Sequence, residues 1–275
     1  MSSGLAARLV TGMILASAIV LIVLYVPPLA FTILIGGLLL IGFWEWTRLA
    51  GLPGRALRLL ALLAQAGLMV ALWWWLPGDG LFAVTTVACM FWLLALLWLR
   101  HPGFAAADRP AARALKWLAG VVAITGAWAA ATAIREALPQ GTAWLLACLV
   151  MIYSSDTLAF FTGRTFGGRK MAPRISPGKT WAGLYGAVIG SFPIALVLGW
   201  LLSLRGPALV GWMLLAGAAV LLAVAGDLFE SILKRHRQVK DSGRLFPGHG
   251  GLLDRTDSLL AALPLFATGL AWLLP

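Results

Sequence analysis

The sequence predicts an all-α integral membrane protein with about nine transmembrane helices, its N-terminus in the cytoplasm and its C-terminus outside. Of its 275 residues, 61% are hydrophobic and only 11% are charged, whereas about a quarter of the residues in a soluble domain are charged. The apolar residues form long runs, and about 20 of them in a helix cross a bilayer core of ~30 Å. Residues 1–275 are therefore expected to form a single membrane domain.

Nine apolar runs are long enough to cross the bilayer. The first resembles the apolar part of a signal peptide, but it is long for one and no A-x-A-like cleavage site follows it, so we expect a retained helix. The predicted helices span Leu9–Val26, Leu29–Trp46, Leu57–Leu76, Leu81–Leu99, Leu115–Ile134, Ala143–Phe161, Ala182–Leu204, Ala208–Phe229 and Ser258–Leu274.

Basic residues set the predicted orientation. Of the 21 Lys and Arg residues, all but Arg135 and Arg205 fall in alternate loops on one side of the predicted membrane. Because basic residues accumulate in cytoplasmic loops, this side is expected to be the cytoplasm. The same bias explains the net charge of +11 without a nucleic-acid partner. Cys89 and Cys148 lie in apolar runs, which indicates neither a disulfide framework nor a zinc site.

Two predicted cytoplasmic loops, residues 163–181 and 234–257, are unusually rich in charged residues and glycine. The first contains Ser-Pro-Gly-Lys-Thr from Ser176 to Thr180, and free backbone N–H groups beside a Lys suit a phosphate. Its glycine spacing is not that of a Walker A motif, and a plain basic loop is the alternative. Asp156, just before this loop, is expected either in a structural polar cluster or facing a wet cavity. Glu45 is expected to cap a helix or to pair with Arg48.

The second loop follows a helix in which Asp227, Glu230 and Lys234 share one face, an arrangement that a helix-end salt bridge would also explain. Asp254 and Asp257 open the last predicted helix, where acids suit the helix dipole. The groups expected at one cytoplasmic face are the carboxylates Asp156, Asp227, Asp254 and Asp257, the cations Lys179, Lys234, Arg235, Lys240 and Arg255, and the glycines Gly248, Gly250 and Gly251.

Carboxylates without suitable Cys ligands, and with a single suitable His, point to Mg²⁺ rather than zinc. Carboxylate-held Mg²⁺ among basic groups is typical of phosphoryl or nucleotidyl transfer.

The segment from Ser231 to Ser258 resembles the signature of the phosphatidate cytidylyltransferases, also called CDP-diacylglycerol synthases. That signature has the form S-x-x-K-R-x4-K-D-x5-P-G-H-G-G-x-x-D-R-x-D, and the chain meets every fixed position. The segments DTLAFFTGRTFGGRK, ISPGKTW and FWEWTRLAG also resemble the family, so the likeness spans nearly the whole chain. The family usually reads K-T-W-E-G, whereas this chain has Ala182 in place of the acid.

The resemblance implies that CTP and phosphatidate condense to CDP-diacylglycerol and pyrophosphate in phospholipid biosynthesis. It also implies a bacterial inner membrane protein with a cytoplasmic active site, a requirement for Mg²⁺, a second, monovalent cation such as K⁺, and a homodimer. Helices in residues 1–134 would form an N-terminal part, and those in residues 135–275 the catalytic part.

By motif position, the resemblance makes Asp227 and Asp254 the metal carboxylates, with Ser176, Lys179 and Thr180 meeting the substrate phosphates. Lys234, Lys240 and Asp257 are the further catalytic candidates. His249 is expected to hydrogen-bond within its loop, with acid–base catalysis as the alternative. The other substrate-binding candidates are Asp156, Lys234, Arg235, Gly250, Gly251 and Arg255.

The chemistry agrees with this implied reaction. A phosphate oxygen of phosphatidate is already ionised, so no Ser–His or Cys–His pair is needed as nucleophile. What remains is alignment and charge neutralisation at the α-phosphate of CTP.

Three rival functions remain: a transporter or channel, a CDP-alcohol phosphotransferase and a CTP-dependent lipid kinase. The characteristic D-G-x2-A-R-x8-G-x3-D-x3-D motif of the phosphotransferases is absent from the sequence. A kinase would release CDP instead of pyrophosphate.

Overall fold

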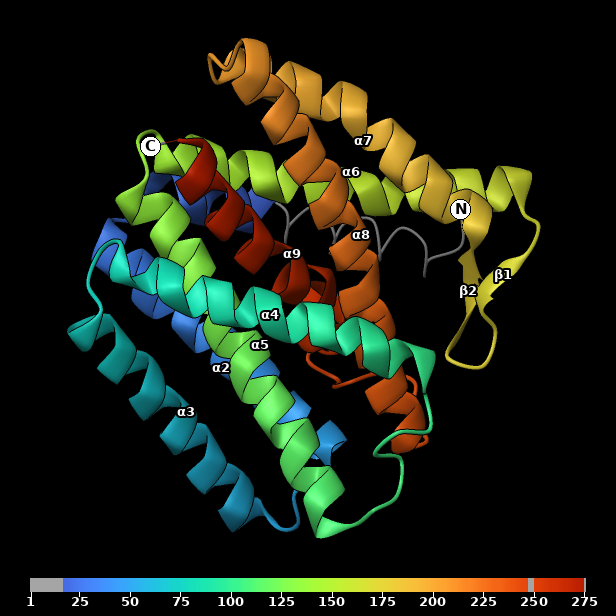
Figure 1. The fold of residues 1–275 in the computed structure, drawn as a ribbon. Coiled ribbons are helices and arrows are strands. Elements are labelled where there is room, and N and C mark those ends of the chain that lie inside the picture. Colours follow the sequence, from blue (N-terminus) through green and yellow to red (C-terminus); the bar gives the residue numbers. More distant parts are fainter. Residues whose placement is uncertain (1–16, 247–249, 275) are drawn as a thin grey trace.

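The computed structural model describes residues 17–246 and 250–274, and Figure 1 shows them as a bundle of long helices. Eight of the helices are long and apolar enough to cross a membrane, and residues 17–25 form part of a further helix. The prediction of an all-α polytopic membrane protein is confirmed. The eight helices are α2 (Pro28–Ala50), α3 (Arg55–Trp75), α4 (Gly80–Arg100), α5 (Pro110–Ala137), α6 (Gly141–Phe166), α7 (Trp181–Leu201), α8 (Gly206–His236) and α9 (Leu253–Leu273).

Helix α9 lies at the centre of the bundle, where it contacts α2, α4, α5, α6 and α8. Helix α5 is also deeply buried, and its buried residues are mostly Ala and Gly. Small residues let membrane helices approach closely. A Cβ on Gly120 would lie 2.4 Å from the ring of Trp46, and one on Gly126 would lie 2.2 Å from the Cβ of Ala88. These contacts pack α5 tightly against α2 and α4.

The largest departure from the predicted helix bounds is in α8. This helix has 31 residues, which is about 46 Å of rise, and so it is longer than the ~30 Å bilayer core. Lys234, Arg235 and His236 occupy its last turn, where positive charge is favourable beside the helix C-terminus. The helix continues past the predicted apolar run, which ends at Phe229, as the shared face of Asp227 and Lys234 indicated, and Asp227 lies about two and a half turns before its end.

Residues 163–181 also differ from the predicted open loop. Helix α6 continues to Phe166, and a hairpin of β1 (Lys170–Ala172) and β2 (Ser176–Thr180) follows. The strands are antiparallel, with Lys170 opposite Thr180. Figure 1 shows the hairpin at the side of the bundle, beside the end of α6 and the start of α7. The Ser-Pro-Gly-Lys-Thr segment is therefore a strand that leads directly into a helix.

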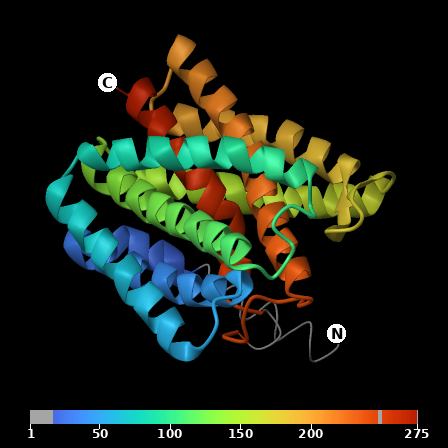
Figure 2. The same cartoon turned by 60° about the horizontal axis from the view of Figure 1, so that its bottom comes forward.

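We call the end of the bundle where α8 finishes the basic end. There, Arg237 lies 3.3 Å from Asp108 in the α4–α5 connection, and the His236 ring hydrogen-bonds the carbonyl of Pro102 at 2.7 Å. Hydrogen bonds from Arg113 to Asp108 lower the pKa of that carboxyl to about 2. Figure 2 shows the chain connections that gather at this end.

A candidate active site at the basic end

A cavity of about 500 Å³ lies between α6, the hairpin, α7 and α8. It contains two carboxylates and three basic side chains, a mixture expected of a site that holds both phosphate groups and a cation. Its lining residues are Asp156, Ala159, Phe160, Gly163, Arg164, Lys170, Met171, Gly178, Lys179, Thr180, Gly183, Leu184, Val224 and Asp227.

Strand β2 places Lys179 directly against α8. Its Nζ lies 2.7 Å from Asp227 Oδ2 and donates to the carbonyl of Val224 at 3.3 Å. The next residue, Thr180, accepts a hydrogen bond at its hydroxyl from Gly183 N at 3.1 Å, and so it caps the N-terminus of α7. The hairpin thus brings a cation to the cavity and starts a helix at its wall.

The carboxylates come from three different helices. Asp156 projects from α6 and Asp227 from α8, and both line the cavity. Asp257 of α9 lies within electrostatic range of Asp227. Asp227 interacts in the same way with Asp156. Asp227 is repelled by both other acids, and a bound cation or the neighbouring basic side chains would relieve that repulsion.

A second, buried network lies beside the cavity. Lys234 Nζ forms ion pairs with Glu230 at 2.7 Å and with Asp254 at 2.8 Å. The other oxygen of Asp254 accepts hydrogen bonds from Ser242 N, Ser242 Oγ and Gly251 N, at 2.8 to 2.9 Å. Asp254 therefore joins α8 to the start of α9 and to the segment between them.

Glu45 completes this network from α2. Its carboxylate accepts hydrogen bonds from Leu252 N at 3.2 Å and Leu253 N at 2.9 Å, and it lies 2.9 Å from Ser242 Oγ, whose one proton it shares with Asp254. Glu45 is a cap, as one of the two expectations had it, but the helix that it caps is α9, about 200 residues away in sequence. Arg48 instead donates to the carbonyl of Ser242.

Gly250 and Gly251 let the backbone before α9 approach the Glu45 carboxylate closely. A Cβ on Gly251 would lie 2.3 Å from Glu45 Oε2, and Gly250 has φ of +81°, a conformation that favours glycine. Both therefore shape the turn that leads into α9, which is a structural role. Gly248 and His249 lie outside the described residues.

The remaining predicted residues are not among those that line the cavity. Ser176 pairs with Ala172 at the far end of the hairpin. Arg235 donates to the carbonyls of Ile175 and Val239, so it holds the hairpin against the end of α8. Lys240 and Arg255 are exposed, and Arg255 lies within electrostatic range of Asp156.

Two basic residues of the cavity, Arg164 and Lys170, were not singled out from the sequence. They belong to the basic run that follows Asp156, and that run was the only sequence signal for them. Which members of the run face the cavity depends on where α6 ends and where the hairpin begins.

The predicted Mg²⁺ carboxylates have different surroundings. Asp227 lines the cavity, whereas the oxygens of Asp254 accept four hydrogen bonds from the protein. Within residues 17–246 and 250–274, no group of three or more His, Cys, Asp or Glu is arranged to hold a metal ion. Mg²⁺ is commonly held by one or two carboxylates together with substrate phosphates, and the cavity acids fit that mode. The assignment of the metal to Asp227 and Asp254 stays a prediction.

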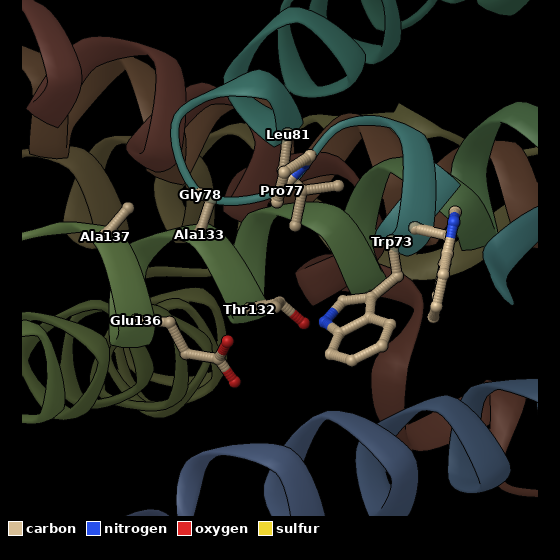
Figure 3. Close-up of a pocket in the computed structure, with 9 residues that line it drawn as sticks. Trp73, Pro77, Gly78, Leu81, Thr132, Ala133, Glu136 and Ala137 are labelled. Atoms are coloured by element: carbon tan, nitrogen blue, oxygen red, sulfur yellow. The ribbon is translucent and has the colours of Figure 1, made fainter. Parts of the chain in front are cut away.

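A different cavity, of about 430 Å³, lies at the opposite end of α5. Figure 3 shows Trp73, Thr132 and Glu136 along its wall. Glu136 accepts a hydrogen bond from Thr32 Oγ1 at 2.6 Å. Among the described residues that line this cavity there is no Lys or Arg, so it lacks the groups that would hold phosphates.

The fold and the cavity at the basic end define a polytopic membrane protein with a site suited to phosphate groups and a cation. The chain belongs to the cytidylyltransferase family, whose sequence model matches residues 6–273.

Its relatives include three bacterial proteins named phosphatidate cytidylyltransferase. The protein of Pseudomonas aeruginosa is 37% identical over 243 residues, which are 88% of both chains. The protein of Haemophilus influenzae is 32% identical over 286 residues, with 94% of this chain and 96% of the relative covered. The protein of Bacillus subtilis is 42% identical over 134 residues, 48% of each chain.

Proposed function

We propose that this chain condenses CTP with phosphatidate to give CDP-diacylglycerol and pyrophosphate. We place it in a bacterial inner membrane, with the active site on the cytoplasmic side. The observation that carries this proposal is the Lys179–Asp227 pair, which lies in a cavity with Arg164, Lys170 and Asp156 at the basic end of a membrane bundle. The names of the relatives support the choice of substrates.

The position of the cavity suits a reaction between a lipid and a nucleotide. The cavity contains charged side chains, yet its walls come from helices long enough to cross a membrane. A phosphate at the membrane surface and a nucleotide from the cytoplasm would therefore meet there. The lipid phosphate is itself the nucleophile, so the side chains need only align the two phosphates and neutralise their charge.

The basic residues of the cavity supply that neutralisation. Lys179, Lys170 and Arg164 line the same cavity from β2, β1 and the end of α6. Pyrophosphate gains negative charge as it leaves, and fixed cations stabilise that charge where water is excluded. We assign these three residues to the CTP phosphates, and we assign Arg255 of α9, which interacts electrostatically with Asp156, to the lipid phosphate.

The family resemblance adds Mg²⁺ to the proposal. When bound, Mg²⁺ supplies charge neutralisation between the nucleotide phosphates. Asp227 would hold it from the cavity wall, and Lys179 would then turn towards the phosphates. For Asp254 to become a ligand, it must exchange one of its hydrogen bonds, such as that from Lys234. A monovalent cation such as K⁺ and a homodimer complete the proposal on the resemblance alone.

The test is turnover of CTP and phosphatidate by the purified protein with Mg²⁺. Release of CDP-diacylglycerol and pyrophosphate in equal amounts is expected. Release of CDP would indicate a lipid kinase, and solute uptake without CTP turnover would indicate a transporter. Lys179→Met is expected to lower turnover at least a hundredfold, whereas Arg100→Met, which removes an exposed cation outside the cavity, is the matched control.

A further inference from the structure

An apolar cavity of about 240 Å³ lies in the membrane-spanning part of the bundle. Helix 17–25 covers it on one side, and α2, α5, α6 and α9 form its other walls. Apart from Tyr153 and Thr256, the described residues that line it are hydrophobic. Protein interiors contain few voids larger than a water molecule, so the space left between the described residues is large enough to accept an apolar group.

The cavity runs along α9 from Leu252 to Leu263, which is about 16 Å of helix rise. Its two polar residues, Tyr153 and Thr256, each lie within one helical turn of an acid of the candidate active site. Tyr153 is within electrostatic range of Asp156, Asp257 and Arg255. Thr256 directly precedes Asp257 in α9. The cavity is therefore elongated, apolar along its length and polar only beside the charged residues.

Helix α6 connects this cavity to the charged one. Leu149 and Tyr153 line the apolar cavity, and Asp156 and Phe160 line the charged cavity. These residues follow one another at intervals of three and four, so they lie on one face of α6. A molecule with its phosphate among the basic residues of the charged cavity and an attached apolar chain would follow this face from one cavity into the other.

We infer that the apolar cavity holds one acyl chain of the phosphorylated lipid substrate and sets the chain length that the protein accepts. This inference rests on the proposed function and deepens it. Lipid tails are as apolar as the cavity walls, so transfer from the bilayer adds little affinity. The cavity therefore selects through shape: a chain that fits fills the void, and a chain that is too long forces the walls apart.

The residues that line the apolar part of the cavity are then the ones that determine specificity. Ala131 of α5 and Leu149 of α6 both line the cavity and are 5% and 8% exposed. A larger side chain at either position would occupy space that the end of a long acyl chain needs. The neighbouring Val150 is 46% exposed on the outside of the bundle and does not line the cavity, so it offers a matched control.

The experiment is a competition between two lipids in one mixed micelle. Dilauroyl and distearoyl phosphatidate are supplied in equal amounts with CTP, and the two CDP-diacylglycerol products are quantified by mass spectrometry. Because both lipids compete for the same protein molecules, the product ratio does not depend on how much of a variant is folded. Leu149→Trp and Ala131→Leu are expected to shift the ratio about tenfold towards the shorter lipid, the size of a typical overpacking cost. Val150→Trp is expected to leave it within about twofold of the wild type.

An unchanged ratio in both Leu149→Trp and Ala131→Leu would overturn the inference, even if total turnover fell, because a structural lipid or a packing defect would lower both products equally. An equal shift in Val150→Trp would also overturn it. Failure of the proposed function would look different, since wild-type protein would then convert neither lipid.

Discussion

Gly226 of α8 lies directly against the backbone of Asp257 in α9, where a Cβ on Gly226 would be 2.6 Å from the carbonyl oxygen of Asp257. This close approach brings the neighbouring Asp227 within electrostatic range of Asp257. Helices α8 and α9 thus cross beside Asp227 and Asp257, and the absence of a side chain at Gly226 makes that crossing possible.

Replacing this glycine should separate the two helices. Gly226→Ala is expected to lower the free energy of unfolding by about 1–3 kcal/mol, because the added methyl overpacks the crossing. Turnover should fall at least tenfold in the fraction that stays folded, since Asp227 and Asp257 move apart. Gly37→Ala is the control, because a Cβ there meets nothing within 4 Å. Equal behaviour of the two variants in thermal unfolding and CTP turnover would contradict the prediction.

The two predicted metal carboxylates should respond differently to loss of charge. Asp227→Asn is expected to lower turnover by about 3–4 kcal/mol of transition-state stabilisation and to raise the Mg²⁺ concentration needed for half-maximal rate. Asp254→Asn should also lower turnover. However, it weakens a buried pair with Lys234, so its folded state should lose about 1–3 kcal/mol as well.

Mg²⁺ titrations and thermal unfolding of the purified variants separate these effects. Asp241→Asn serves as the control, because Asp241 is exposed and its side chain has no ion pair within the described residues. A normal rate at low Mg²⁺ for Asp227→Asn would remove that residue from the metal site.

Glu45 is expected to act as a positioning residue. Glu45→Ala leaves Leu252 N and Leu253 N without their acceptor, and an unsatisfied buried donor costs about 1–3 kcal/mol. Glu45→Gln keeps an oxygen acceptor and should restore part of that stability and part of the turnover. Measurement of kcat and KM for both variants tests this. No recovery in Glu45→Gln would mean that the negative charge, rather than the cap, is required.

Ala182 occupies the first turn of α7, two residues after the Thr180 cap. Ala182→Glu is expected to be tolerated, because an acid near a helix N-terminus is favourable by about 0.3–1 kcal/mol. Turnover should equal or exceed that of the wild type, since the change restores the residue that the resembling family usually has there. Loss of turnover in well-folded protein would show that the start of α7 is arranged around alanine.

The orientation in the membrane remains a prediction from the basic loops. Single cysteines at Gly78 and Gly206 should react with an impermeant thiol reagent added outside intact cells, and one at Gly168 should react only after the membrane is opened. Native Cys89 and Cys148 are buried, so they should contribute little background. Labelling of Gly168 from outside would reverse the orientation.

The sequence by itself determined the class of fold, because burial in a bilayer demands long apolar runs and those runs can be counted without knowing what they contact. It also located the charged segments, since ionisable residues are costly within a membrane. For the same reason Asp156 and Asp227 stood out before their contacts were known. Lys179 stood out because the Ser-Pro-Gly-Lys-Thr segment suits a phosphate, and the structure places all three at one cavity.

Only the tertiary structure decided which basic residue pairs with which carboxylate. Asp227 lies with Lys179, whereas Asp254 is held by Lys234 and by the turn that Glu45 caps. The hairpin was equally beyond the sequence. A local sequence pattern indicates where one helix is apolar. Which partner a carboxylate binds depends on contacts with elements that are far away in the chain, and these contacts are set only by the tertiary structure.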